Sequence, residues 1–134
     1  MFNVVFKNYE TWLICGGRNF ADQAMFDDVM SRLMEMWGCP ECVVHGGATG
    51  ADAMAGKWAS QMAIGAIEVK ADWQLHGPAA GPIRNELMLT DHKPKRVIAF
   101  PGGKGTADMV TRARKRPEVD VAEIKATLSP TQRD

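Results

Sequence analysis

Residues 97–106 read VIAFPGGKGT and join a short apolar run to a turn that contains three glycines. A short apolar run bounded by turn signals is typical of a buried strand. Two other segments share this design: residues 12–15 lead into GGRN at 16–19, and residues 42–44 lead into HGGATG at 45–50. A helical pattern follows each turn, so bare backbone N–H groups and the positive end of a helix would face an anion. Three such units in 134 residues favour a phosphate-bearing small ligand.

Apolar runs and helical patterns alternate along the whole chain. The predicted strands cover residues 11–15, 42–45, 66–70, 96–100 and 119–123, and the predicted helices cover residues 22–37, 51–63, 80–90 and 106–116. Strands that alternate with helices are joined by right-handed crossovers, which gives a parallel sheet covered on both faces. We therefore predict an α/β fold: a single Rossmann-like, three-layer domain with a parallel five-stranded sheet in the order 3-2-1-4-5. The domain is expected to span residues 1–126, and residues 127–134 are expected to form a polar C-terminal tail.

This topology predicts that the three glycine turns meet at one site. Ligands of such sheets bind at the carboxyl ends of the strands, beside the point where the strand order reverses. The turns at 16–19 and 101–106 flank that point, and the turn at 45–50 is the next neighbour. The predicted ligand-binding residues are Gly16, Gly17, Arg18, Asn19, His45, Gly46, Gly47, Thr49, Gly50, Trp73, Asn85, Pro101, Gly102, Gly103, Lys104, Gly105 and Thr106.

Two arginines are candidate phosphate ligands. Arg18 follows two glycines at the predicted crevice, where a guanidinium suits a phosphate, although a solvated loop arginine is the alternative. Arg84 lies in the first turn of a predicted helix, where a cation opposes the helix dipole. A bound anion would remove that penalty. Thr106 either caps the last predicted helix or binds a phosphate oxygen.

Other candidates have structural alternatives as well. Thr49 and Asp52 fit the spacing of a capping box, while Asp52 is also a candidate acceptor for a ribose hydroxyl. His45 either serves as an acid–base group or hydrogen-bonds a neighbouring loop. Trp73 follows the third predicted strand, and it either stacks on a base or belongs to the core.

The composition excludes several classes of function. The 16 basic and 16 acidic residues cancel, which disfavours broad binding to nucleic acids or to membrane surfaces. The chain shows no apolar run of about 18 residues and no secretory signal, so we expect neither a membrane span nor export. Its three cysteines include CPEC at 39–42, which lacks a second cysteine pair for zinc. We therefore expect no metal, no cofactor and a cytoplasmic location.

Five motifs resemble those of the SLOG superfamily, and within it the YspA-like and YpsA-related branch. They are GGRNF at 16–20, HGGATGAD at 45–52, ADW at 71–73, AGPIRN at 80–85 and FPGG at 100–103. The resemblance runs over residues 13–116. It implies a Rossmann-like fold and a nucleotide or nucleotide-derived ligand, in a branch whose small members occur in bacteria and phages.

The resemblance extends to the LOG phosphoribohydrolases, which cleave the bond between a base and ribose 5′-monophosphate. Their motif, Pro-Gly-Gly-x-Gly-Thr-x-x-Glu, is matched from Pro101 to Thr106, but Met109 replaces the catalytic glutamate. Arg84 resembles the arginine that assists catalysis. A carboxylate offsets the positive charge that develops on the ribose. Asp108 is turned by about 100° on the helix, so the resemblance leaves Asp52 or Asp72 to act as the carboxylate beside Arg84.

Three functions therefore stay open. The first is nucleotide binding with hydrolysis of the bond between base and ribose, and the second is a non-catalytic sensor or sequestering protein for a signalling nucleotide. The third is single-stranded DNA binding, because the DNA-processing protein DprA contains a related fold. Its only support here is RARKR at 112–116, which equally suits the C-terminus of a helix. LOG relatives self-associate, which implies a homodimer.

Overall fold

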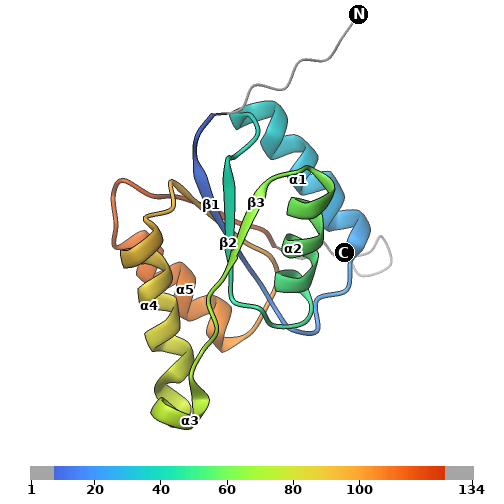
Figure 1. Ribbon diagram of the computed structural model, residues 1–134. Helices are drawn as coiled ribbons and strands as arrows, with labels where there is room; N and C mark the ends of the chain where they lie inside the picture. The colour runs from blue at the N-terminus through green and yellow to red at the C-terminus, as the bar shows by residue number, and fades with distance from the viewer. Residues whose placement is uncertain (1–7, 126–134) are drawn as a thin grey trace, which may run out of the picture.

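The computed structural model describes residues 8–125, whose strands form a parallel five-stranded sheet in the order β3-β2-β1-β4-β5 (Figure 1). The strands are β1 (Thr11–Cys15), β2 (Cys42–His45), β3 (Gly65–Glu68), β4 (Arg96–Ala99) and β5 (Asp120–Glu123). The predicted fold class and strand order are confirmed. The predicted tail, residues 127–134, lies outside the described residues.

Helices cover both faces of the sheet. They are α1 (Gln23–Trp37), α2 (Ala51–Gln61), α3 (Trp73–His76), the 3-10 turn η1 (Gly77–Ala79), α4 (Ala80–His92) and α5 (Lys104–Arg114). Helices α1 and α2 lie on one side of the sheet, and α4 and α5 lie on the other (Figure 1). Within residues 8–125, no helix combines the length and the apolar character that a membrane span requires.

The alternation of side chains along β1 divides the core into two layers. Trp12 and Ile14 are fully buried with residues of α1 and α2, where Trp12 stacks on Trp58 at 6.4 Å between ring centroids. Leu13, equally buried, packs with residues of α4 and α5 on the opposite face. Successive strand residues point to opposite faces, so a run that is apolar throughout fits a strand covered on both sides.

Two local predictions at helix starts differ from the structure. Helix α2 begins after Gly50 with no side-chain cap, so the capping box of Thr49 and Asp52 is not formed. The Thr49 hydroxyl instead donates to the Arg18 carbonyl at 2.9 Å. The N-cap position of α5 is Gly103 and not Thr106, and no side chain caps this end of the helix. Close packing explains the glycine before α2, because a Cβ on Gly50 would lie 2.2 Å from the Gly17 carbonyl oxygen, whereas a Cβ on Gly103 would meet no atom within 4 Å.

Helix α3 lies in a segment that we expected to be a loop. The Asp72 carboxylate caps it by accepting from the Leu75 N–H at 3.0 Å. Its four residues are too few to show a helical period, which explains why the sequence pattern does not reveal it. Helix α3 projects beyond the carboxyl ends of the strands, at the lower end of the molecule in Figure 1.

Candidate ligand-binding site

A cavity of about 230 Å³ lies at the carboxyl ends of the central strands, between the N-terminal ends of α4 and α5. It is lined by Cys15, Gly16, Gly17, Arg18, Gly46, Ala48, Asp52, Arg84, Asn85, Met88, Gly103, Lys104, Gly105 and Thr106. Residues from all three glycine turns are therefore present in one cavity.

Backbone hydrogen bonds hold the three turns together. The Gly17 N–H donates to the Pro101 carbonyl at 2.9 Å, and the Gly17 carbonyl accepts from the Ala51 N–H at 3.2 Å. Gly50 has φ +71°, and a Cβ at this position would lie 2.2 Å from the Gly17 carbonyl oxygen. Such an approach is closed to any residue with a side chain. The first turn is thus clamped between the other two.

Two other glycines leave the backbone at the start of α5 accessible to a ligand. A Cβ on Gly103 or Gly105 would meet no atom within 4 Å. The first hydrogen bond of α5 runs from the Ala107 N–H to the Gly103 carbonyl at 3.0 Å, and no side chain caps this end. The N–H groups of residues 104–106 precede that bond, so the helix gives them no acceptor. This uncapped helix end lines the cavity and is suited to bind an anion.

Arg84 reaches the cavity from α4. Its Nη1 donates to the Gly46 carbonyl at 3.0 Å and to the Val69 carbonyl at 3.3 Å, while its Nε donates to Asn85 Oδ1 at 3.2 Å. These bonds hold the guanidinium beyond the carboxyl end of β2, in the cavity that the uncapped end of α5 also lines. Arg18 and Lys104 add two exposed cations at the rim.

Asp52 contributes a buried carboxylate to the same cavity. It is 6% exposed, and Oδ2 accepts from the Ala48 N–H at 3.1 Å. Burial raises the pKa of Asp52 above its usual value, although the Ala48 N–H and the charge of Arg84 oppose the rise. A carboxyl group with a raised pKa beside a guanidinium in a cavity is a candidate acid–base group.

The missing side chain of Gly46 is what brings Asp52 and Arg84 close. A Cβ on Gly46 would lie 2.4 Å from Arg84 Nη1 and 3.0 Å from Asp52 Oδ2. Cys15, the last residue of β1, lies in the same cavity. Burial raises the pKa of its thiol to about 12, so Cys15 lines the cavity as an uncharged thiol and is not a nucleophile at neutral pH.

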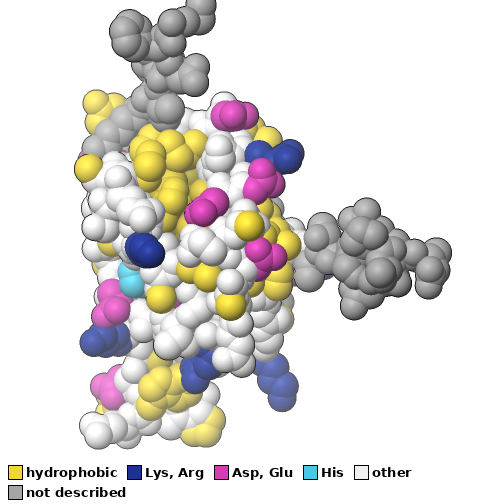
Figure 2. Space-filling view, turned by 90° about the vertical axis from the view of Figure 1, so that its right-hand side faces the viewer, with side chains coloured by type: hydrophobic (Ala, Val, Ile, Leu, Met, Phe, Trp, Pro, Cys, Tyr) yellow, Lys and Arg dark blue, Asp and Glu magenta, His cyan; other side chains and the backbone are white. Residues whose placement is uncertain are grey.

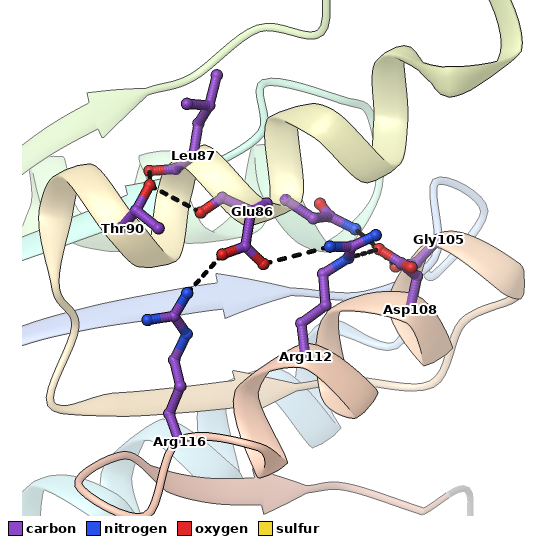
Figure 3. Close-up of polar contacts among 8 residues, drawn as sticks. Glu86, Leu87, Thr90, Gly105, Asp108, Arg112 and Arg116 are labelled. Carbon is purple, nitrogen blue, oxygen red and sulfur yellow. Dashed lines mark hydrogen bonds and ion pairs between the residues drawn. The ribbon is translucent and has the colours of Figure 1, made fainter.

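A polar network behind the cavity fixes α4 against α5 (Figure 3). The buried Asn85 donates through Nδ2 to the Gly105 carbonyl at 3.1 Å and to Asp108 Oδ2 at 2.9 Å. Asp108 also accepts from Arg112 Nε at 2.9 Å, and Glu86 lies between Arg112 and Arg116 and accepts from both (Figure 3). Because Asn85 holds Gly105, this network sets the position of the uncapped end of α5.

Asp108 should make the stability of the protein depend on pH. Its bonds from Asn85 and Arg112 outweigh partial burial and lower the pKa of Asp108. Its contribution is therefore present above the pKa of the unfolded chain and is lost as pH falls through the folded pKa. We expect Asp108→Asn to lose about 1 kcal/mol at pH 7. Urea unfolding should show this deficit shrinking toward zero in acid, and a deficit independent of pH would contradict the assignment.

The predicted site residues fall into two groups. The cavity contains Gly16, Gly17, Arg18, Gly46, Asp52, Arg84, Asn85, Gly103, Lys104, Gly105 and Thr106. The remaining predicted residues are outside its lining: Asn19, His45, Gly47, Thr49, Gly50, Asp72, Trp73, Pro101 and Gly102. Several of these have structural roles, since His45 Nδ1 accepts from the Gly47 N–H at 3.1 Å and Asp72 caps α3.

Three lining residues were not predicted: Cys15, Ala48 and Met88. Met88 follows Arg84 by four residues, so the helical spacing alone could have placed it on the same face as Arg84. Cys15 and Ala48 carry no chemical signal and enter through the path of the backbone. Residues 8–125 contain no group of three or more His, Cys, Asp or Glu side chains placed to hold a metal ion.

The parallel sheet and the cavity formed by its glycine turns define a Rossmann-like protein, and comparison with known families agrees. The model of the YspA, cpYpsA-related SLOG family (YAcAr) matches residues 13–76, and the chain belongs to this family. It is also similar to the Gene 61 protein of Mycobacterium phage D29. The two are 34% identical over 110 residues, which cover 77% of this chain and 87% of the phage protein. The family match includes the first two glycine turns and ends before Arg84.

Proposed function

We propose that the cavity binds the sugar phosphate of a nucleotide or of a nucleotide-derived small molecule. The observation that carries this proposal is the uncapped end of α5, which lines the same cavity as Arg84. The phosphate would accept from the N–H groups of residues 104–106, and Arg84 and the rim cations would balance its charge. Membership of the SLOG family supports a nucleotide-related ligand.

The size of the cavity favours the sugar phosphate as the enclosed part. Its volume of about 230 Å³ is below the roughly 300 Å³ at which pockets for whole small molecules begin. A base attached to the sugar would therefore extend outside. Asp52 lies on the wall of the same cavity and is the proposed acceptor for a ribose hydroxyl. Buried polar groups that pair with hydroxyls would select sugar phosphates over other anions.

Binding without hydrolysis is the form of this function that the structure favours. Met109, at the position of the LOG glutamate, is 1% exposed and packs in the core with residues of β1 and β4. It lies outside the lining, so a carboxylate for glycosidic cleavage would have to come from Asp52. Nucleic-acid binding loses its support, because Arg112, Arg114 and Arg116 each form an ion pair with a glutamate of this chain.

Titration calorimetry tests the proposal with ribose 5-phosphate, AMP, GMP and ADP-ribose, with ribose and adenosine as controls that lack phosphate. We expect heat from the phosphorylated compounds and none from the controls, and an affinity that falls as salt is added. Chromatography of AMP after incubation measures free adenine and so separates binding from hydrolysis. The absence of heat with every phosphorylated compound would overturn the proposed function.

A further inference from the structure

Trp73 is a large apolar side chain that the fold leaves half exposed. Its exposed fraction is 54%, whereas Trp12 and Trp58 are buried in the core. This exposure rules out the core interpretation of Trp73 that the sequence allowed. A tryptophan with more than half of its surface exposed is less common than a buried one, because burying its large ring stabilises the fold.

The indole lies over a glycine of α4. Its Cη2 atom is 3.4 Å from the place where a Cβ on Gly81 would be, and Cζ2 is 4.0 Å from that place. Gly81 belongs to the first turn of α4. Because Gly81 has no side chain, the ring approaches the helix closely, and the opposite part of the ring is left to solvent.

The helical spacing places this ring beside the cavity. Arg84, Asn85 and Met88 follow Gly81 by three, four and seven positions, so all four residues share one face of α4. The same three residues line the cavity. Trp73 therefore lies on the cavity side of α4, about one helical turn, or 5.4 Å, beyond the cavity lining.

The segment that follows Trp73 carries few charges. Residues 73–83 read WQLHGPAAGPI and contain no Asp, Glu, Lys or Arg. Hydrophobic side chains gather at the lower end of the molecule in Figure 2, which is the end that α3 occupies in Figure 1. A flat aromatic ring with few charges around it recognises a partner by stacking rather than by hydrogen bonds.

We propose that the exposed face of Trp73 stacks on the base of a nucleotide whose sugar phosphate occupies the cavity. This inference rests on the proposed function and adds the class of ligand. Stacking is tolerant of base identity because every base has an aromatic face, and it grows with ring area. Purine nucleotides are accordingly preferred over pyrimidine nucleotides, and either binds more tightly than ribose 5-phosphate.

Calorimetry with AMP and ribose 5-phosphate on Trp73→Ala and Leu75→Ala tests this inference. Trp73→Ala should lower the affinity for AMP about tenfold to a hundredfold and leave the affinity for ribose 5-phosphate unchanged. Trp73→Phe should retain part of the AMP affinity because it keeps a smaller ring. Leu75→Ala is the matched control, since Leu75 is an exposed apolar residue of the same helix α3. It should change neither affinity.

The outcomes separate this inference from the function on which it rests. If the unmodified protein binds neither compound, the proposed function fails. If it binds ribose 5-phosphate and AMP equally, or if Trp73→Ala leaves AMP binding intact, only the stacking inference fails. An equal loss of affinity for both compounds in Trp73→Ala would show that the indole supports the fold around α3. A shift from dimer to monomer on gel filtration would show that it belongs to an interface. Either result would overturn the inference.

Discussion

Gly50→Ala should destabilise the protein by about 3 kcal/mol or more, because the change combines backbone strain with a steric clash. Gly50 has φ +71°, a conformation that alanine adopts at a cost. The added methyl would lie 2.2 Å from the Gly17 carbonyl oxygen and 2.7 Å from the carbonyl carbon of Arg18. Both are backbone atoms, so the methyl cannot be accommodated by a side-chain rotation. The melting temperature should fall by roughly 10 °C.

Gly105→Ala is the matched control for this change. Gly105 lies in α5, and a methyl there would meet no atom within 4 Å. Alanine is a better helix former than glycine, so this variant should be neutral or more stable by up to about 1 kcal/mol. Melting followed by circular dichroism compares the two variants. Equal melting temperatures would show that the close packing of the turns around Gly50 does not stabilise the fold.

The contrast between Gly50 and Gly105 shows how far the sequence predicts this site. Apolar runs followed by glycine turns predict the parallel sheet and its strand order, because the three central strands β1, β2 and β4 are largely buried on both faces. They also predict which turns meet. They do not distinguish a glycine that packs against a neighbouring turn from a glycine whose backbone N–H is accessible, because both kinds lie in similar glycine-rich turns. That difference depends on distances between turns that are remote in sequence.

Asp52 and Trp73 show the same limit for side chains. The spacing of Thr49 and Asp52 fits a helix cap, yet the close approach of Gly50 to Gly17 moves the cap and leaves Asp52 to the cavity. Likewise, the position of Trp73 depends on the short helix α3 and on Gly81. Local patterns predict the elements, and tertiary packing decides which polar groups are left for a ligand.

Arg84→Ala should weaken ribose 5-phosphate binding about a hundredfold, because it removes the cation that is fixed in the same cavity as the uncapped end of α5. The guanidinium is held by the Gly46 and Val69 carbonyls, so little entropy would be lost when it binds an anion. Arg32→Ala is a control for lost charge, since Arg32 is an exposed residue of α1 that pairs with Asp28. Calorimetry should show no change in affinity for Arg32→Ala. A loss of less than about threefold in Arg84→Ala would remove Arg84 from the proposed site.

The same variant has a second expected effect through Asp52. The charge of Arg84 lowers the pKa of Asp52 and so partly opposes the rise caused by burial. Without Arg84 the pKa of Asp52 rises further, and the folded protein then binds a proton that the unfolded chain releases. Stability falls as pH rises through that window, so the deficit of Arg84→Ala should grow from acid to neutral pH. Urea unfolding of the variant and of Arg84→Ala combined with Asp52→Asn measures this effect. In the double variant, the loss of stability should no longer grow with pH, because asparagine cannot ionise. If the loss still grows with pH in the double variant, its cause is not the ionisation of Asp52.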